Sequence, residues 1–139
     1  MSFNIIIDSC GELTKEMKED SRIISAPLTL EAGGETFIDD ETFDQKMFLE
    51  KIASASECPK SSCPSPQFYY DGYMTGETHH YAVTLSAELS GSYNSAILGR
   101  SMALDHNPDM KIHVFNSRSA SVGQTLIARK IVEYEEQDM

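Results

Sequence analysis

Three short apolar segments constrain the fold of this chain most strongly. They are "FNIIID" at 3–8, "YAVTLS" at 81–86 and "KIHVFN" at 111–116, and each is rich in β-branched or aromatic residues. A segment of helical character follows each of them along the chain, and strands that alternate with helices are typical of a parallel sheet. We therefore predict an α/β fold: a three-layer α/β/α Rossmann-like domain with a mainly parallel sheet, in which these strands are neighbours.

Helices are predicted wherever apolar residues recur at helical spacing. The segments with this character are 13–20, 44–54, 67–75, 91–106 and 123–137. Within 91–106, one apolar face falls in an arc of roughly 120° at about 100° per residue. Its members are Tyr93, Ala96, Ile97, Ala103 and Leu104. The stretch 22–38 contains Pro27 and the turn "EAGGE", which favours a β-hairpin or an excursion at the sheet edge.

Length and composition exclude several classes of protein. A chain of 139 residues suits one domain, and 40% hydrophobic residues can form a core. The net charge of -11 argues against partners with a phosphate backbone and against docking on anionic lipid. We expect no signal peptide, because the amino terminus lacks a basic region and a long apolar core. No apolar run approaches the ~20 residues of a membrane span.

The cysteines and histidines give no sign of a metal site. Cys10, Cys58 and Cys63 have no zinc-ligand spacing to any of the four histidines. We expect reduced thiols in a cytoplasmic protein, with no metal and no cofactor. The acidic run "DDE" at 39–41 is interpreted as a solvated turn before a helix rather than as a cation site.

Small polar residues follow all three predicted strands. Asp8 ends the first strand, Ser90 and Gly91 follow the second, and Asn116 ends the third. The carboxyl ends of parallel strands lie along one edge, where open α/β sheets bind ligands. Hydroxyls beside helix amino termini suit an anionic head group, and glycine lets a ligand approach backbone amides. Plain helix capping is the alternative for each serine taken alone.

The segment "CPKSSCPSPQFYY" at 58–70 is the second informative stretch. Its three prolines predict a stiff, extended loop, and Ser65-Pro66 is typical of a helix start. Ser61 and Ser62 could present hydroxyls from this loop. A stiff connector without a binding role explains the loop equally well.

Familiar catalytic motifs are absent. The chain has no G-x-S-x-G elbow, no phosphate-binding Walker loop and no G-x-G-x-x-G. His79 and His80 precede the strand at 81–86, so they are expected at the opposite end of the sheet from Ser90. This placement disfavours a serine–histidine pair.

Four motifs, in order, resemble those of the DegV family. "IIIDSCGEL" is similar to an opening of the type "TDSTADL", "PKSSCPS" to "PKTSQPS", "LSAELSGSYNSA" to "SSxLSGTYQSA", and "VFNSRSASVGQ" to a strand and turn beginning "viDS". The motifs cover most of the chain, and the second and third are quite specific.

The resemblance implies a two-domain protein that binds a long-chain fatty acid between its domains. Some members carry acyl chains to a separate fatty acid kinase, so such a kinase is an expected partner. The residues that match those holding the head group are Ser61, Ser90 and Gly91. A carboxylate or acyl phosphate would be held there without being cleaved. The alternative is a hydrolase or phosphotransferase with Ser90 as its nucleophile.

The chain departs from the family pattern in several places. Ser61 replaces a threonine and keeps the hydroxyl, whereas Cys63 and Asn94 replace glutamines and Asn116 replaces an aspartate. The chain also ends before the second domain that the resemblance implies, so we expect 1–139 to be the amino-terminal lipid-binding domain. An apolar face left open by the absent domain would then favour self-association. Its expected members or neighbours are Phe68, Tyr69, Tyr73, Leu98 and Met102.

Overall fold

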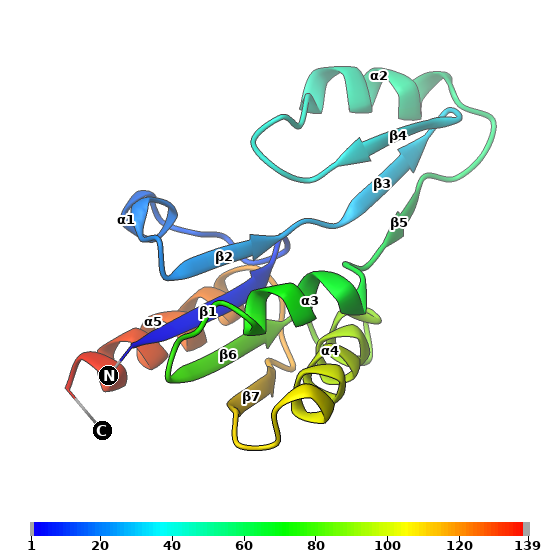
Figure 1. Ribbon diagram of the computed structural model, residues 1–139. Helices are drawn as coiled ribbons and strands as arrows, with labels where there is room; N and C mark the ends of the chain where they lie inside the picture. The colour runs from blue at the N-terminus through cyan, green and yellow to red at the C-terminus, as the bar shows by residue number, and fades with distance from the viewer. Residues whose placement is uncertain (1, 138–139) are drawn as a thin grey trace.

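The computed structural model describes residues 2–137, and its main body is built on a parallel sheet (Figure 1). Four strands pair side by side in the order β2-β1-β6-β7. They are β1 (Phe3–Asp8), β2 (Ile23–Ala26), β6 (His79–Thr84) and β7 (Lys111–Asn116). The three predicted strands are therefore neighbours in one sheet, although β6 begins and ends two residues before the predicted 81–86.

Helices cover both faces of this sheet. On one face lie α3 (Pro66–Tyr73) and α4 (Ser92–His106), and on the other α1 (Lys15–Glu19) and α5 (Val122–Glu136) (Figure 1). The cause is visible in β1, whose six residues are all buried. Successive side chains of a strand point to opposite faces, so Ile6 packs with the α3–α4 core while Ile5 and Ile7 pack with the α1–α5 core. The predicted three-layer α/β/α architecture is confirmed.

A second, smaller sheet forms a lobe that projects from the main body (Figure 1). It contains β3 (Thr29–Ala32), β4 (Glu35–Ile38) and β5 (Lys60–Ser62), paired antiparallel in the order β4-β3-β5, with α2 (Gln45–Ser54) beside it. Gly33 and Gly34 have φ of 58° and 79°, the left-handed values that a tight hairpin turn requires. Both structures predicted for 22–38 occur in that segment: β2 is an edge strand of the main sheet, and the β3–β4 hairpin follows it.

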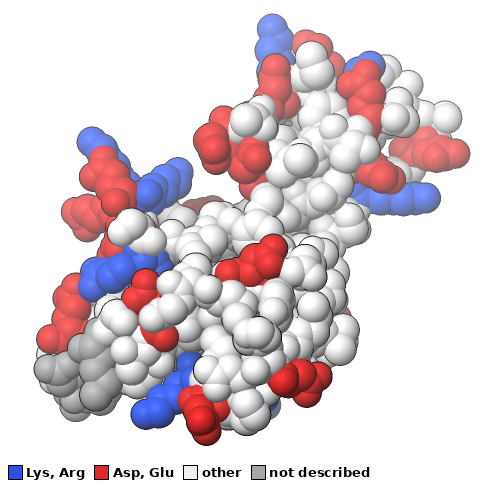
Figure 2. Space-filling model, in the orientation of Figure 1, with Lys and Arg blue, Asp and Glu red and all other residues white. Residues whose placement is uncertain are grey.

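Charged side chains are distributed unevenly over the surface. In the view of Figure 2 they gather on the lobe and beside α1 and α5, whereas α3 and α4 present few of them. Leu98 and Met102 on α4 are 56% and 38% exposed. No helix among residues 2–137 combines the length and the apolar character that crossing a membrane would need.

Two residues of the expected open face belong to the core instead. Tyr69 and Tyr73 are wholly buried in the cluster between α3, α4 and the sheet. The reason is that α3 turns these rings toward the sheet, where Tyr73 donates its hydroxyl hydrogen to the Ala96 carbonyl oxygen at 3.2 Å. Phe68 is half-buried, so only the α4 residues of that set are truly open to water.

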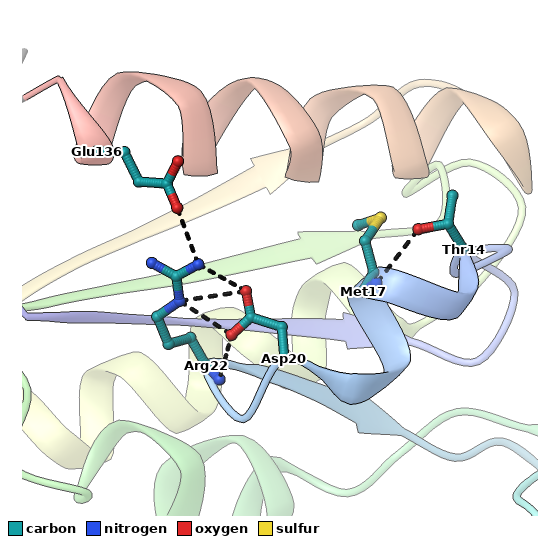
Figure 3. Close-up of polar contacts among 5 residues, drawn as sticks. All are labelled: Thr14, Met17, Asp20, Arg22 and Glu136. Atoms are coloured by element: carbon teal, nitrogen blue, oxygen red, sulfur yellow. Dashed lines mark hydrogen bonds and ion pairs between the residues drawn. The ribbon is translucent and has the colours of Figure 1, made fainter.

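An ion-pair cluster joins the start of β2 to the end of α5 (Figure 3). The Arg22 guanidinium lies 2.7 Å from Asp20 Oδ2 and 3.1 Å from Glu136 Oε1. Hydrogen bonds from Arg22 lower the pKa of Asp20. The groups are largely solvated, so the cluster contributes little stability, on the order of 1 kcal/mol or less. Nearby, Thr14 Oγ1 accepts from the Met17 N–H at 3.2 Å and caps α1.

We predict that Gly99→Ala destabilises the protein. A glycine-to-alanine change inside a helix normally stabilises by roughly 0.5–1 kcal/mol. At Gly99, however, a Cβ would lie 2.7 Å from the Pro66 carbonyl oxygen and 3.0 Å from the Tyr70 nitrogen, both backbone atoms of α3. The two helices would have to separate, so we expect a loss of about 1–3 kcal/mol in urea unfolding.

Ser101→Ala, an exposed change on the same helix, is the matched control and should alter stability by less than about 0.5 kcal/mol. A Gly99→Ala protein as stable as the parent would show that α3 and α4 are not packed at this distance.

Candidate functional site at the carboxyl edge of the sheet

Ser90 and Gly91 lie in the loop that joins the central strand β6 to α4. Gly91 is the N-cap residue of α4, and as a glycine it has no side chain to cap the helix. Ser90 Oγ accepts from the Ser92 N–H at 3.2 Å and so satisfies one amide of the first turn. At α3, by contrast, Ser65 Oγ accepts from the Phe68 N–H in the usual capping geometry. Capping therefore explains Ser65 fully and Ser90 only in part.

The segment after Ser61 packs against this same helix start. Ser61 lies in β5, opposite Leu30. Two residues further on, Cys63 Sγ lies 3.4 Å from Ser95 Oγ on α4. It also lies 3.2 Å from the point where a side chain at Gly91 would begin, so glycine permits this close approach. The two predicted binding loops are adjacent, while convergence of the Ser61 and Ser90 hydroxyls on one anion stays a prediction.

The site is open on the surface of this chain. Ser61 and Gly91 are exposed and Ser90 is half-buried. A cavity of about 880 Å³ lies nearby, beside the ends of β1 and β2, and Ser9 and Pro27 are among the residues that line it. None of the three predicted head-group residues lines that cavity.

Asp8, the last residue of β1, is a wholly buried carboxylate at this edge. Its Oδ2 accepts from the Leu85 N–H at 2.7 Å, and its Oδ1 accepts from Gln124 Nε2 at 2.9 Å and from the Cys10 N–H at 3.2 Å. Burial raises the pKa of the Asp8 carboxyl, and the hydrogen bonds that it accepts, that from Gln124 first, oppose the rise. Sequence reasoning placed Asp8 at the edge but missed this role; the one available signal was a charged residue closing a continuous apolar run.

Asn116 is the last residue of β7, which lies on the opposite side of β6 from β1, and its side chain also accepts hydrogen bonds. Its Oδ1 lies 3.1 Å from the Ala87 nitrogen and 3.1 Å from the Arg118 nitrogen. An aspartate would offer oxygens for the same bonds. The departure from the family pattern at 116 therefore leaves these acceptor contacts in place.

Two buried polar atoms behind the site have no hydrogen-bond partner among the residues that the structure describes. They are the Tyr69 hydroxyl and Gln124 Oε1. Burial raises the pKa of Tyr69, and the negative charge of nearby Asp8 adds to this effect. Both phenol and carboxyl thus lie in one poorly solvated region beneath the loop that carries Ser90.

Within residues 2–137, none of the four histidines lies at this edge. His79 and His80 are the first two residues of β6, His106 is the last residue of α4, and His113 pairs with Tyr81 in β7. Ser90 accordingly has no histidine beside it to act as a base. Its hydroxyl can donate a hydrogen bond to an anion, but the edge lacks a serine–histidine pair for bond cleavage.

The acidic run at 39–41 forms a turn, as predicted. Asp40 Oδ1 accepts from the Thr42 N–H at 2.8 Å, and Asp44 caps α2 through the Met47 N–H. In the described part of the chain, no group of three or more histidine, cysteine, aspartate or glutamate side chains comes together as metal ligands would.

Comparison with known proteins identifies the family of this chain. The family model described as "Uncharacterised protein, DegV family" matches residues 2–138. The chain belongs to the DegV family. A DegV domain-containing protein of Streptococcus gordonii is 33% identical over 133 residues, which are 94% of this chain and 47% of that protein. The chain thus spans about half the length of the curated relatives that it matches.

Solved structures of DegV proteins have the same fold. A DegV family protein of Ruminococcus gnavus, whose structure is described with vaccenic acid, superimposes with a TM-score of 0.95 at 47% identity. The Streptococcus pneumoniae Fatty Acid Kinase (Fak) B3 protein, loaded with linoleic acid, superimposes with a TM-score of 0.86 at 32% identity. All of this chain and 50% of each of those chains are covered.

We predict that the Cys10 thiol resists alkylation. Burial, together with the negative charges of Asp8 and Asp39, raises its pKa from 9.0 to about 11. The thiolate fraction at pH 8 is then about a hundredfold lower than at the ordinary value. Iodoacetamide followed by peptide mass spectrometry should label the exposed Cys58 rapidly and Cys10 roughly a hundred times more slowly than an unhindered cysteine peptide.

Raising the pH through 11 should remove this protection, and Asp39→Asn should speed the reaction at pH 8. Equal labelling of Cys10 and Cys58 at pH 8 would contradict the buried environment.

Proposed function

We propose that this chain is a DegV lipid-binding domain that holds the carboxylate of a long-chain fatty acid, or an acyl phosphate, at Ser61, Ser90 and Gly91. The observation that carries the proposal is the pair of hydroxyl-bearing loops that meet at the amino end of α4, whose N-cap residue is a glycine; within residues 2–137 no histidine lies beside Ser90. The R. gnavus relative, described with vaccenic acid, supports the choice of ligand.

The electrostatics of the chain require that the head group be bound locally. A net charge of -11 repels an anion at long range, so general attraction cannot bring the ligand to the site. Hydroxyl donors and the amides at the start of α4 act only at contact distance, where the helix dipole also favours negative charge. Buried methylenes would supply most of the remaining affinity, at about 0.8 kcal/mol each.

The open site argues that a second domain completes it. Residues 1–139 would form one of two domains that enclose the ligand, because Ser61 and Gly91 are exposed and the matched relatives are about twice as long. The second domain would add the remaining apolar walls.

A fatty acid kinase is the partner that fits this role. A protein that binds the carboxylate without cleaving it can present the carboxylate to an enzyme that phosphorylates it, and the likeness to the Fak B3 protein supports this. We place the protein in the cytoplasm, because its three cysteines are free thiols.

Ser90→Ala is expected to weaken fatty-acid binding. The change removes one hydrogen bond to a charged carboxylate, a loss of about 1.5–3 kcal/mol, or roughly ten- to a hundredfold in Kd. Calorimetric titration of the full-length protein with vaccenic acid measures this change in Kd. Ser101→Ala, an exposed serine on the same helix, is the control and should leave Kd unchanged.

Unchanged affinity in the Ser90→Ala protein would count against the head-group assignment. Turnover of acyl esters or acyl phosphates that Ser90→Ala abolishes would instead support the hydrolase or phosphotransferase alternative.

The 139-residue chain alone is expected to self-associate or to bind fatty acid only weakly. Leu98 and Met102 leave apolar surface open on α4, and such surface tends to find a partner. Sedimentation velocity should show a concentration-dependent shift that Leu98→Gln with Met102→Gln reduces. A monomer that binds vaccenic acid with submicromolar affinity would show that one domain suffices.

A further inference from the structure

The loop that carries Ser90 is held from both sides by the strands that flank β6. Beyond Thr84 the central strand has ended, so the N–H groups that follow have no ladder partner in the sheet. Side chains take over: Asp8 Oδ2 receives the Leu85 N–H at 2.7 Å, and Asn116 Oδ1 receives the Ala87 N–H at 3.1 Å. Each acceptor is the last residue of a neighbouring strand, β1 on one side and β7 on the other.

Ser86 lies between Leu85 and Ala87 and connects them by hydrogen bonds to Ser90. Its own N–H donates to the Ser119 carbonyl oxygen at 2.9 Å, so three consecutive amides are fixed. The Ser86 carbonyl oxygen in turn accepts from the Leu89 N–H at 2.9 Å and from the Ser90 N–H at 3.1 Å. The Ser86 carbonyl oxygen therefore holds the Ser90 N–H, and the hydrogen bonds of three consecutive amides, at 85–87, hold Ser86 itself.

We propose that Asp8 and Asn116 are positioning residues that hold the Ser90–Gly91 turn in the shape that receives the fatty-acid carboxylate. This inference rests on the proposed function. Neither side chain needs to touch the ligand, since Asp8 is wholly buried and both act through backbone N–H groups.

The two positions differ in what they require chemically. Asp8 serves three N–H donors with two oxygens in a buried place, which a carboxylate does and a single amide oxygen does not. Asn116 serves two backbone donors with one oxygen, which either an amide or a carboxylate can do. Asn116→Asp should therefore keep the function that Asn116→Ala loses.

The test combines vaccenic-acid titration with amide hydrogen exchange in the full-length protein and in the 139-residue chain. Asp8→Ala and Asn116→Ala should each raise Kd about three- to tenfold, and Asn116→Asp should leave it within about twofold. In a Ser90→Ala background the same two changes should raise Kd less than they do in the parent, because part of their effect passes through the Ser90 hydroxyl and only the part that passes through Gly91 remains. If Asp8→Ala does not fold, Asn116→Ala with its Asn116→Asp rescue still decides the question.

The matched control is Asn4→Ala. Asn4 is a buried polar residue of the same strand, but it lies at the opposite end and donates to the Gly72 carbonyl oxygen at 2.8 Å. Its loss should lower stability without raising Kd. Losses that are additive with Ser90→Ala, or equal in Asn4→Ala, would overturn the positioning role.

Hydrogen exchange without lipid separates this inference from the proposed function. Asp8→Ala and Asn116→Ala should speed exchange at Leu89 and Ser90 relative to the amides of α3, whereas Asn4→Ala and Asn116→Asp should not. Failure of the parent protein to bind vaccenic acid would defeat the proposed function alone. Unchanged exchange at Ser90 would defeat the positioning role alone.

Discussion

The burial of β1 on both of its faces is the constraint on which the rest of the structure depends. A strand with six buried residues cannot lie at a surface, so helices must cover it on each side. Its parallel neighbours then end at the same edge as β1, which brings Asp8, Thr84 and Asn116 into one row. The loops that follow these residues meet there because of that register.

The sequence was a good guide wherever one local rule decided the outcome. Short runs rich in β-branched or aromatic residues predicted β1 and β7 with their bounds and β6 with a shift of two residues, and Ser65-Pro66 predicted the start of α3. It was a weaker guide where tertiary contacts decide. Tyr69 and Tyr73 of α3 were expected at or near a ligand-binding face, but they lie on the side of α3 that faces the sheet and belong to the core. Helix propensity does not indicate which side of a helix will face the sheet.

The candidate site shows the same division. A motif pointed to Ser61, Ser90 and Gly91, and the structure shows their two loops packed together through Cys63. Two of the three hydrogen bonds of Asp8 could not be predicted from the sequence, because their donors lie 77 and 116 residues away along the chain. Long-range polar contacts of this kind follow from topology and leave no periodicity in the sequence.

The chain passes between the body and the lobe twice, once between β2 and β3 and once between β5 and α3. Ser61 belongs to the lobe, whereas Ser90 and Gly91 belong to the body. The proposed head-group site is therefore shared between the lobe and the body. Pro27 stands at one crossing and Pro64 at the other, and the fixed φ of proline stiffens both. A site that is already ordered before the ligand binds loses less conformational entropy on binding.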